Sequence, residues 1–350
     1  LDSLAAILDE TNVSGIRQAF DDIQSTLTSM QDPSKVNDPI YESELRTRMQ
    51  QLTNLLNSSS KDISQAIKNE YTKLDGTGSS ENGYVDEVND ILRQIGDLNR
   101  QIKTNELVGQ SALELKDERN VLLDELAGYL PIEVTYYKDE AHDGIDANGQ
   151  TDTIDAKREI YDLDKNGNII GKKEWPDDLK VELVFTDGNG TNKITLIDGT
   201  KGTDSDNYGS IAVGKDQDDP TKAFITVTGT DPAAADVSFG YDAGTSAPSA
   251  NQLSGGSIAS SLAMLVQDGT GTSVRGYQYY MNKLDTLART FAEVINKCNT
   301  DHKGDALLTA QPNGGNITAA NIGLSSDWVA GNIHIASDGD STNGAILDML

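Results

Sequence analysis

Apolar residues recur at steps of three and four from Val85 onward, which is the spacing of one face of an α-helix that packs along its length. The members of this stripe are Val85, Val88, Leu92, Ile95 and Ile102, with Asn99 in its one polar position. A further helix is predicted after Gly109, because Ser111 and Glu114 have the spacing of a capping box. Gly128 and Pro131 are typical of its C-terminal end.

The chain before this stretch has the same helical period. One stripe consists of Ile16, Phe20, Ile23, Leu27 and Met30. Asp38 followed by Pro39 predicts a new helix start, with an N-cap and proline in the first helical position. The second stripe consists of Leu45, Met49, Leu52, Leu56, Ser59, Ile63, Ala66 and Leu74.

After Pro131 the period changes from about 3.6 to 2, which predicts strands separated by turns rich in Asp, Asn and Gly. The strand candidates are Ile132–Tyr137, Glu159–Leu163, Val181–Phe185, Lys193–Ile197, Ala223–Thr228 and Val237–Phe239. This β-rich, acidic region is expected to end near Ser254.

Helical spacing returns near the C-terminal end of the chain. A short amphipathic piece contains Ile258, Leu262 and Leu265. A longer stripe follows in strict four-three steps at Tyr280, Leu284, Leu287, Phe291, Val294 and Cys298. Beyond Gly304 the sequence is turn-rich, and residues 345–350 are expected to start another helix.

The fold class predicted from these patterns is α+β, with an elongated helical bundle built from N- and C-terminal segments and an inserted β-rich domain. Helices of this length bury their stripes in order to be stable, so the helices on either side of the β-rich block are expected to pack against each other. The predicted division is residues 1–131 for the first part of the bundle, 132–254 for the insert and 255–350 for the second part. By sequence pattern alone, an ordinary helical domain with no wider meaning is the favoured explanation of the heptads.

Composition narrows the classes of function. The chain has 350 residues and a net charge of −28, which argues against binding nucleic acid or an anionic membrane. No apolar run approaches the length of about 20 residues that spans a bilayer. Cys298 is the only cysteine and lies in a helical stripe, so a small buried thiol is expected there.

Several ordered segments resemble the flagellar hook-associated protein 1 (FlgK-like) family, which forms the first hook–filament junction. The first are Asn89–Ile102, Gly109 and Leu113–Leu126, in which Asp117 and Arg119 match the family's Arg-Asp signature loosely. The others are Phe20–Leu27, Gly255–Leu262, Leu284–Ala288, Ile295 with Asn296, His302 with Gly304, Ile317–Ile322 and Asp340–Leu350. The resemblance covers nearly the whole chain outside the β block, although no single motif is specific by itself.

The resemblance implies a structural part of the bacterial flagellum that adapts the hook to the filament. Its expected partners are copies of itself in a ring, the hook protein, the next hook-associated junction protein and an export chaperone. Such a protein is extracellular and leaves the cell through the flagellar secretion channel. Because Leu1 is not preceded by Met, the chain is expected to be a fragment lacking both terminal assembly regions of the family.

No catalytic, cofactor-binding or metal-ligating residues are assigned. Asp162, Asp164 and Asn166 have the spacing of the first part of a calcium loop, but Lys173 occupies the position of the bidentate Glu, and a β-hairpin with an Asn-Gly turn explains the same residues. His142, His302 and His334 are far apart in sequence, and structural or surface roles are the default for them. Tyr277, Tyr279 and Tyr280 could suggest a carbohydrate platform, but residues at this spacing point in different directions on a helix.

Two other classes of function are weighed beside the structural one. The first is an extracellular adhesin-like or calcium-binding β module carried on a helical stalk. The second is an acidic glycoside hydrolase, which requires two carboxylates set across a cleft, and the sequence gives no reason to choose a pair.

Overall fold

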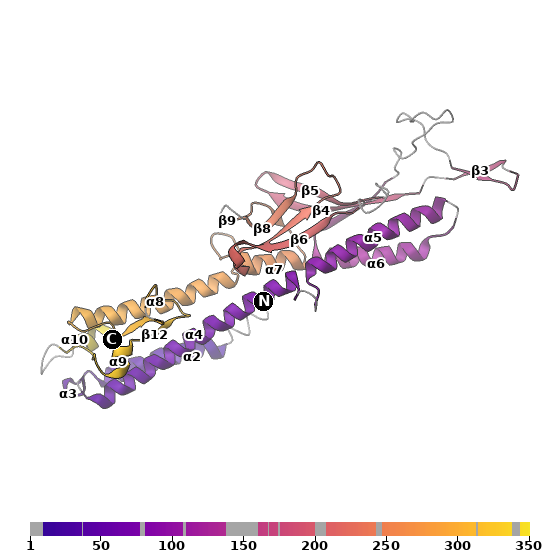
Figure 1. Cartoon of the computed structure of the whole chain (residues 1–350). Coiled ribbons are helices and arrows are strands. Elements are labelled where there is room, and N and C mark those ends of the chain that lie inside the picture. Colours follow the sequence, from indigo (N-terminus) through magenta and orange to yellow (C-terminus); the bar gives the residue numbers. More distant parts are fainter. Residues whose placement is uncertain are drawn as a thin grey trace. The chain divides into compact units, whose positions relative to one another are not determined.

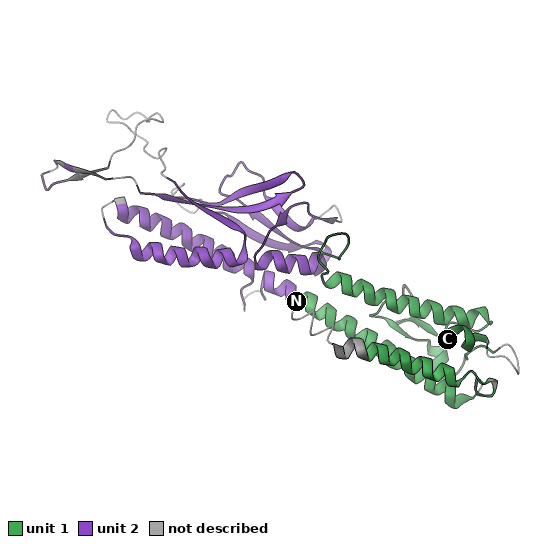
Figure 2. Ribbon diagram, turned by 180° about the vertical axis from the view of Figure 1, so that it is seen from behind, with its two compact units in different colours: residues 1–69, 267–350 green, residues 70–266 purple. Residues whose placement is uncertain are grey.

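The computed structural model describes residues 10–36, 38–77, 81–107, 110–137, 160–166, 168–173, 176–199, 208–242, 247–312, 314–337 and 344–350. The described residues form helices and antiparallel sheets, so the predicted α+β class is confirmed. Two compact units are present (Figure 2). Unit 1 comprises residues 1–69 and 267–350, and unit 2 comprises residues 70–266.

Unit 1 is built around three long helices and several short elements. The helices are α2 (Glu10–Ser29), α3 (Pro33–Val36), α4 (Pro39–Asp75, of which the residues up to Asn69 belong to this unit), α8 (Tyr277–Asp301), α9 (Ser326–Ala330) and α10 (Gly344–Met349). Asp38 caps α4 as predicted, because its Oδ1 accepts a hydrogen bond of 2.9 Å from the Ile40 amide.

The predicted stripes of α2 and α4 form the core of unit 1. Ile23, Leu27 and Met30 of α2 are buried together with Leu45, Met49, Leu52 and Leu56 of α4. Ala288, Ala292 and Ile295 of α8 belong to the same buried cluster. The helical segments before and after the β-rich block therefore pack against each other in this unit, as predicted.

The predicted stripe of α8 is only partly correct. Leu287 and Val294 are 36% and 48% exposed, whereas Ala288 and Ala292 are fully buried. The reason is that α8 carries apolar residues over more than one face, and its small alanines turn toward the unit's core. Strict four-three spacing therefore identified the helix but not its buried side.

The C-terminal part of unit 1 lies between α4 and α8 (Figure 1). Strands β11 (Leu308–Ala310) and β12 (Ile322–Leu324) pair antiparallel, and helix α9 follows them directly. Trp328 of α9 is completely buried in the core formed by α2, α4 and α8. Helix α10 confirms the predicted helix near the C-terminal end of the sequence.

Unit 2 contains a helical hairpin of α5 (Tyr84–Leu107) and α6 (Leu113–Tyr129), and helix α7 (Ser257–Val266). Every predicted member of the α5 stripe is buried, including Asn99 at 4% exposure. The predicted capping box is wrong. Ala112 is the N-cap of α6, and no side chain caps this end of the helix.

Two four-stranded antiparallel sheets complete unit 2, with a separate hairpin. In the first sheet, β4 (Asp178–Asp187) pairs with β1 (Ile132–Tyr137) and β10 (Gln252–Leu253), and also with β5 (Gly190–Asp198). The second sheet has the order β6 (Ser210–Lys215), β7 (Ala223–Thr228), β8 (Val237–Asp242), β9 (Ala247–Pro248). The hairpin consists of β2 (Ile160–Leu163) and β3 (Ile169–Lys173).

All six predicted strands are present, and β1 and β7 have the predicted bounds. The hairpin of β2 and β3 agrees with the β-hairpin expected around Asn166. The strand candidates did not include β6, β9 and β10 in unit 2, or β11 and β12 in unit 1. Strands β9 and β10 contain only two residues each, too few to display a period of two. In β6, two of the six residues are the small Ala212 and Gly214, which weaken the apolar alternation.

The compact units and the predicted domains divide the chain differently. The units group segments that pack together, so α5, α6 and α7 fall with the strands in unit 2. The predicted boundaries after residues 131 and 254 follow the change between helix and strand, and they stay a prediction about independently folding domains. Limited proteolysis would test them, since cleavage near these boundaries or in the turns of the β region is expected.

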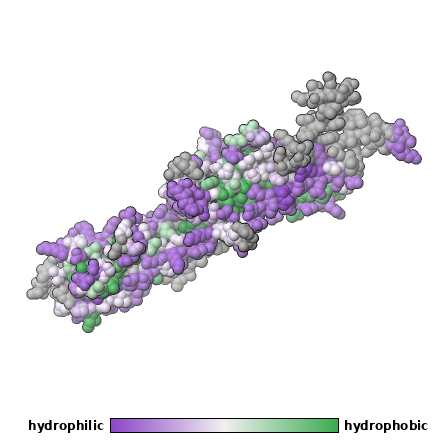
Figure 3. Space-filling model, in the orientation of Figure 1, coloured by the Kyte–Doolittle hydropathy of each residue, from purple (hydrophilic) through white to green (hydrophobic). Residues whose placement is uncertain are grey.

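The surface is largely hydrophilic, in agreement with the many charged residues of the sequence. Hydrophilic residues, purple in Figure 3, cover most of the visible face. Among the described residues, no helix combines the length and the apolar character that crossing a bilayer requires.

Candidate functional site

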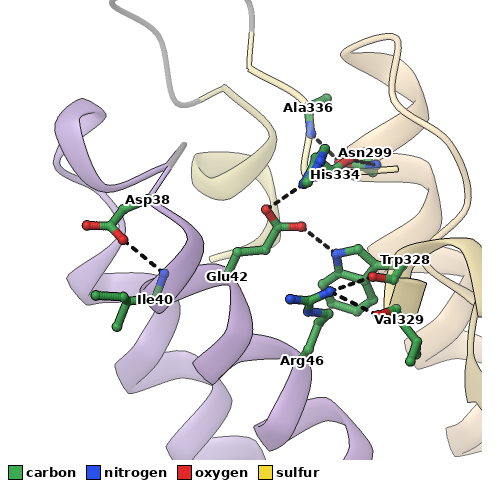
Figure 4. Close-up of polar contacts among 9 residues, drawn as sticks. All are labelled: Asp38, Ile40, Glu42, Arg46, Asn299, Trp328, Val329, His334 and Ala336. Carbon is green, nitrogen blue, oxygen red and sulfur yellow. Dashed lines mark hydrogen bonds and ion pairs between the residues drawn. The ribbon is translucent and has the colours of Figure 1, made fainter. Parts of the chain in front are cut away.

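A polar network in unit 1, drawn in part in Figure 4, binds an irregular backbone segment to helices α4 and α8. One of its members, Asn296, belongs to the segments that carried the family resemblance.

Glu42, in the first turn of α4, is the centre of the network. Its side chain is buried, at 5% exposure for the residue. Oε1 accepts a hydrogen bond of 2.7 Å from the Trp328 indole N–H, and Oε2 lies 3.0 Å from Nδ1 of His334 (Figure 4). A buried carboxylate needs such donors, because burying an unpaired charge is costly. Glu42 therefore fixes α9 and the segment around His334 to the start of α4.

Arg46, one helical turn further along α4, holds the end of α9. Its Nη1 donates to the Trp328 carbonyl oxygen at 2.6 Å, and that of Val329 lies 3.5 Å away (Figure 4). The last carbonyls of a helix have no partners within the helix, so a guanidinium satisfies them well. Two charged residues one turn apart on α4 thus bind the indole N–H and the backbone carbonyl of Trp328.

Asn299 of α8 is fully buried and bridges two segments of the irregular chain that follows α8, which we call the tail. Its Oδ1 accepts from the Ala336 amide at 2.7 Å, and its Nδ2 donates to the Asp305 carbonyl at 2.7 Å. Gly304 lies against it, since a Cβ added there would meet Nδ2 of Asn299 at 2.4 Å. Glycine at this position therefore allows the chain to pass next to the buried amide.

Asn296 of α8 and Asn57 of α4 act in the same way. Asn296 accepts from the amides of Leu307 and Leu308 at 2.8 and 2.9 Å and donates to the Leu308 carbonyl at 2.8 Å. Asn57 donates to the Ala319 carbonyl at 2.8 Å. These side chains make hydrogen bonds with backbone N–H and C=O groups of the tail, which would otherwise need partners in a helix or a sheet.

Sequence reasoning did not assign roles to these asparagines. A signal was present, because asparagine is unfavourable inside a helix unless its side chain makes specific hydrogen bonds. Asn296, Asn299 and Asn57 all lie within helices. Which backbone groups they would bind could not be read from the sequence, because the tail has no regular period.

A second polar cluster lies in unit 2. Arg119 of α6 is 4% exposed and donates from Nη1 to Oδ1 of Asn99 at 2.8 Å. Burial lowers the pKa of the Arg119 guanidinium, while the neighbouring Tyr136 raises it. Asn99 Nδ2 and Arg119 Nε are buried and have no hydrogen-bond partner among the residues that the structure describes. Nearby, Lys103 of α5 forms a buried ion pair of 2.5 Å with Asp178 of β4.

We expect Asn99→Leu to lower the free energy of unfolding by about 2 kcal/mol, because Arg119 loses the acceptor of a buried hydrogen bond that involves a charged group. The double variant Asn99→Leu/Arg119→Met is expected to recover most of this loss, since an apolar pair leaves no buried polar group unsatisfied. Urea denaturation measures both. Arg93→Met, an exposed arginine on the same helix, is the control and should change stability by less than about 1 kcal/mol. A double variant less stable than Asn99→Leu would contradict this account.

Glu87 of α5 and Tyr129 of α6 join the two helices of the hairpin. The Tyr129 hydroxyl donates to Oε2 of Glu87 at 2.5 Å. This hydrogen bond, followed by burial and by the charge of Glu87, raises the pKa of Tyr129 to about 12.

The raised pKa predicts a loss of stability at alkaline pH. The unfolded phenol ionises near pH 10, so the contribution of Tyr129 is fully present below that pH and disappears as the pH rises to about 12. Tyr129→Phe removes the group and is expected to make the decline across this window shallower. Glu87→Gln should lower the pKa of Tyr129, as measured by phenolate absorbance. An unchanged slope in Tyr129→Phe together with an unchanged titration in Glu87→Gln would contradict the assignment.

The positions considered for calcium lie in the β2–β3 hairpin. Oδ1 of Asp164 accepts hydrogen bonds from the amides of Asn166 and Asn168, both at 2.8 Å, so this carboxylate caps the turn. The side chain of Asp162 lies outside the described part. Within the described residues, no group of three or more His, Cys, Asp and Glu side chains is placed to hold a metal ion.

The histidines have separate surroundings. His302 Nε2 lies 2.9 Å from Oδ2 of Asp348 in α10, while His334 contacts Glu42 as described above. Both line an open cavity of about 680 Å³ at this end of unit 1. His142 lies outside the described residues.

Two further expectations concern α8. Cys298 is buried, and this burial raises the pKa of its thiol, so the prediction of a small buried thiol is confirmed. Tyr277 is also buried, at 1% exposure, whereas Tyr279 and Tyr280 contact each other edge to face. The three tyrosines therefore do not form one exposed platform.

Comparison with known proteins shows what this chain resembles. Residues 1–158 match the sequence model described as the flagellar hook-associated protein FlgK helical domain. Flagellar hook-associated protein 1 of Bacillus subtilis (strain 168) is 26% identical over 171 residues, which are 49% of this chain and 31% of that protein. The chain thus spans about a third of the length of this curated relative.

The fold agrees with a solved structure. The flagellar hook junction protein FlgK from Burkholderia pseudomallei shares the fold with a TM-score of 0.52 and 18% sequence identity, over 88% of this chain and 44% of that one. The chain is thus similar to FlgK in sequence over residues 1–158, and it shares the fold of a FlgK protein.

Proposed function

We propose that this chain is part of a structural protein of the bacterial flagellum, which forms the hook–filament junction and adapts the hook to the filament. The observation that carries the proposal is the match of residues 1–158 to the helical domain of flagellar hook-associated proteins. The similarity to a hook junction protein over 88% of the chain supports the same conclusion at the level of the fold.

The contacts in unit 1 suit a structural role rather than catalysis. Glu42, Arg46, Asn296 and Asn299 direct their polar atoms at backbone groups, at a buried indole or at the His334 ring of the same chain. Such bonds make the irregular tail part of the helical core. A junction component has to keep its shape while force passes through it, and this network supplies that stiffness.

The proposal includes the location and the partners. The protein leaves the cell through the flagellar secretion channel with the help of an export chaperone, and it acts outside the cell. It contacts copies of itself in a ring, the hook protein and the next hook-associated junction protein. Its net charge of −28 is consistent with this setting, since it opposes binding to nucleic acid and to anionic lipid.

Deleting the gene in its source bacterium tests the proposal. Electron microscopy should show hooks without filaments, and the medium should contain filament protein that is exported but not retained. Restoring the gene on a plasmid is the control and should restore filaments. Normal filaments and motility in a strain with no second copy of the gene would overturn the proposal.

The deletion strain also distinguishes the junction role from the alternative of an adhesin-like or calcium-binding β module. Loss of adhesion with intact filaments would favour it. Calorimetric titration of the purified chain with calcium is the direct check, because micromolar binding that is lost in Asp164→Asn would assign a calcium site to the β2–β3 hairpin.

A further inference from the structure

The guanidinium of Arg119 is a buried positive charge that forms no ion pair with any carboxylate in the described part of the chain. Arg119 lies in α6 and is 4% exposed. Two carboxylates, those of Glu106 and Asp178, are near enough to favour its charged form and so to raise its pKa. Glu106, however, forms an ion pair with Lys116, and Asp178 forms one with Lys103. The charge of Arg119 therefore lacks a counter-ion of its own, which is costly in a buried position.

Two buried N–H donors at the same place also lack acceptors. They are Nε of Arg119 and Nδ2 of Asn99, and neither has a hydrogen-bond partner among the described residues. Asn99 is 4% exposed, and its Oδ1 accepts a hydrogen bond of 2.8 Å from Nη1 of Arg119. This bond fixes the orientation of the amide, because turning it over would set two donors against each other. Buried donors of this kind are usually satisfied by a bound water molecule or ion.

We propose that a small monovalent anion of the halide class, such as chloride, binds beside Arg119 and Asn99 and accepts hydrogen bonds from Nε of the first and Nδ2 of the second. An anion compensates the guanidinium charge and accepts hydrogen bonds without having to donate any. A water molecule would leave the charge uncompensated and would bring two O–H groups of its own. In the described part of the chain, no buried side-chain oxygen lacks a partner that such a water could supply.

The surroundings favour an ion of single charge. Leu98 and Ile102 of α5 pack with Leu122 of α6, so the two helices enclose the polar pair with apolar side chains. The cost of removing an ion from water rises steeply with its charge, which disfavours sulfate and phosphate here. The Tyr136 ring lies over the guanidinium, 5.6 Å from Cζ, and is 54% exposed. An ion bound beside Arg119 would exchange with solvent past this ring.

A chloride titration of the purified chain tests the site. Sodium chloride replaces sodium gluconate at constant ionic strength, so screening of the net charge of −28 stays the same, and gluconate is too large for the site. The equilibrium constant for unfolding is expected to fall as chloride rises, by about tenfold for each tenfold increase above the dissociation constant. Asn99→Leu/Arg119→Met should abolish this response. Arg93→Met, which changes an exposed arginine on α5, is the matched control and should retain it.

The second measurement locates the ion. Crystals grown in sodium bromide are expected to show an anomalous scattering peak within hydrogen-bond distance of Arg119 Nε and Asn99 Nδ2. An equal chloride response in the wild type and in Asn99→Leu/Arg119→Met, or no response in either, would overturn the proposal. A water molecule or a carboxylate of the chain at that position, without an anomalous signal, would also overturn it. The role at the hook–filament junction does not depend on this site, so the deletion strain reports on that role independently.

Discussion

Trp328→Ala is expected to lower the free energy of unfolding of unit 1 by about 3–5 kcal/mol, which is the usual cost of removing a large buried aromatic side chain. Trp328 has no exposed surface and lies in the core that α2, α4 and α8 share. The change also leaves the buried Glu42 carboxylate with one donor fewer. Urea denaturation followed by circular dichroism measures the loss.

Two further variants separate packing from hydrogen bonding. Trp328→Phe keeps most of the buried ring but removes the indole N–H, so it is expected to cost less than the alanine variant. Val329→Ala is the matched control, because Val329 is the next residue and is 58% exposed. A Trp328→Ala variant as stable as Val329→Ala would show that α9 is not part of the core.

Gly256→Ala is expected to destabilise unit 2 by about 3 kcal/mol or more, because two penalties act together. Gly256 has φ of +93°, a conformation that residues with a side chain rarely adopt. An added Cβ would lie 2.2 Å from the Tyr129 carbonyl oxygen, which is a backbone atom that cannot rotate away. The change should therefore displace the start of α7 from the end of α6.

Gly255→Ala is the matched control for this position. A Cβ on Gly255 would meet nothing within 4 Å, so the change is expected to alter stability by less than about 0.5 kcal/mol. The two variants differ by one position in the same Gly-Gly pair. Equal stability of both in thermal unfolding would contradict the close approach of Gly256 to Tyr129.

The helices of this chain were largely predictable from sequence, because the stripes of α2 and α4 contribute to the core of unit 1 and the stripe of α5 is buried in unit 2. Leu45, Met49, Leu52 and Leu56 are all buried as their heptad spacing predicts. On α8 the same spacing failed, because apolar residues occur on both sides of the helix and periodicity alone does not say which side faces the core.

The network around Glu42 could not be predicted from sequence. Glu42 and Trp328 are 286 positions apart, and no pattern in either segment indicates that they meet. The asparagines of α8 gave a weaker signal, since polar residues at buried helical positions require partners, but their partners lie in a tail without regular period. The family resemblance picked out Asn296, His302 and Gly304 without explaining them, and the structure supplies the reason for Asn296 and Gly304.

The position of the protein on the flagellum tests the central proposal most directly. Antibodies raised against the purified chain, visualised with gold particles on intact flagella by electron microscopy, are expected to label a narrow zone between hook and filament. A strain that lacks the gene should show no label. Gold along the whole filament, or on the cell surface with none at the junction, would contradict the proposed role.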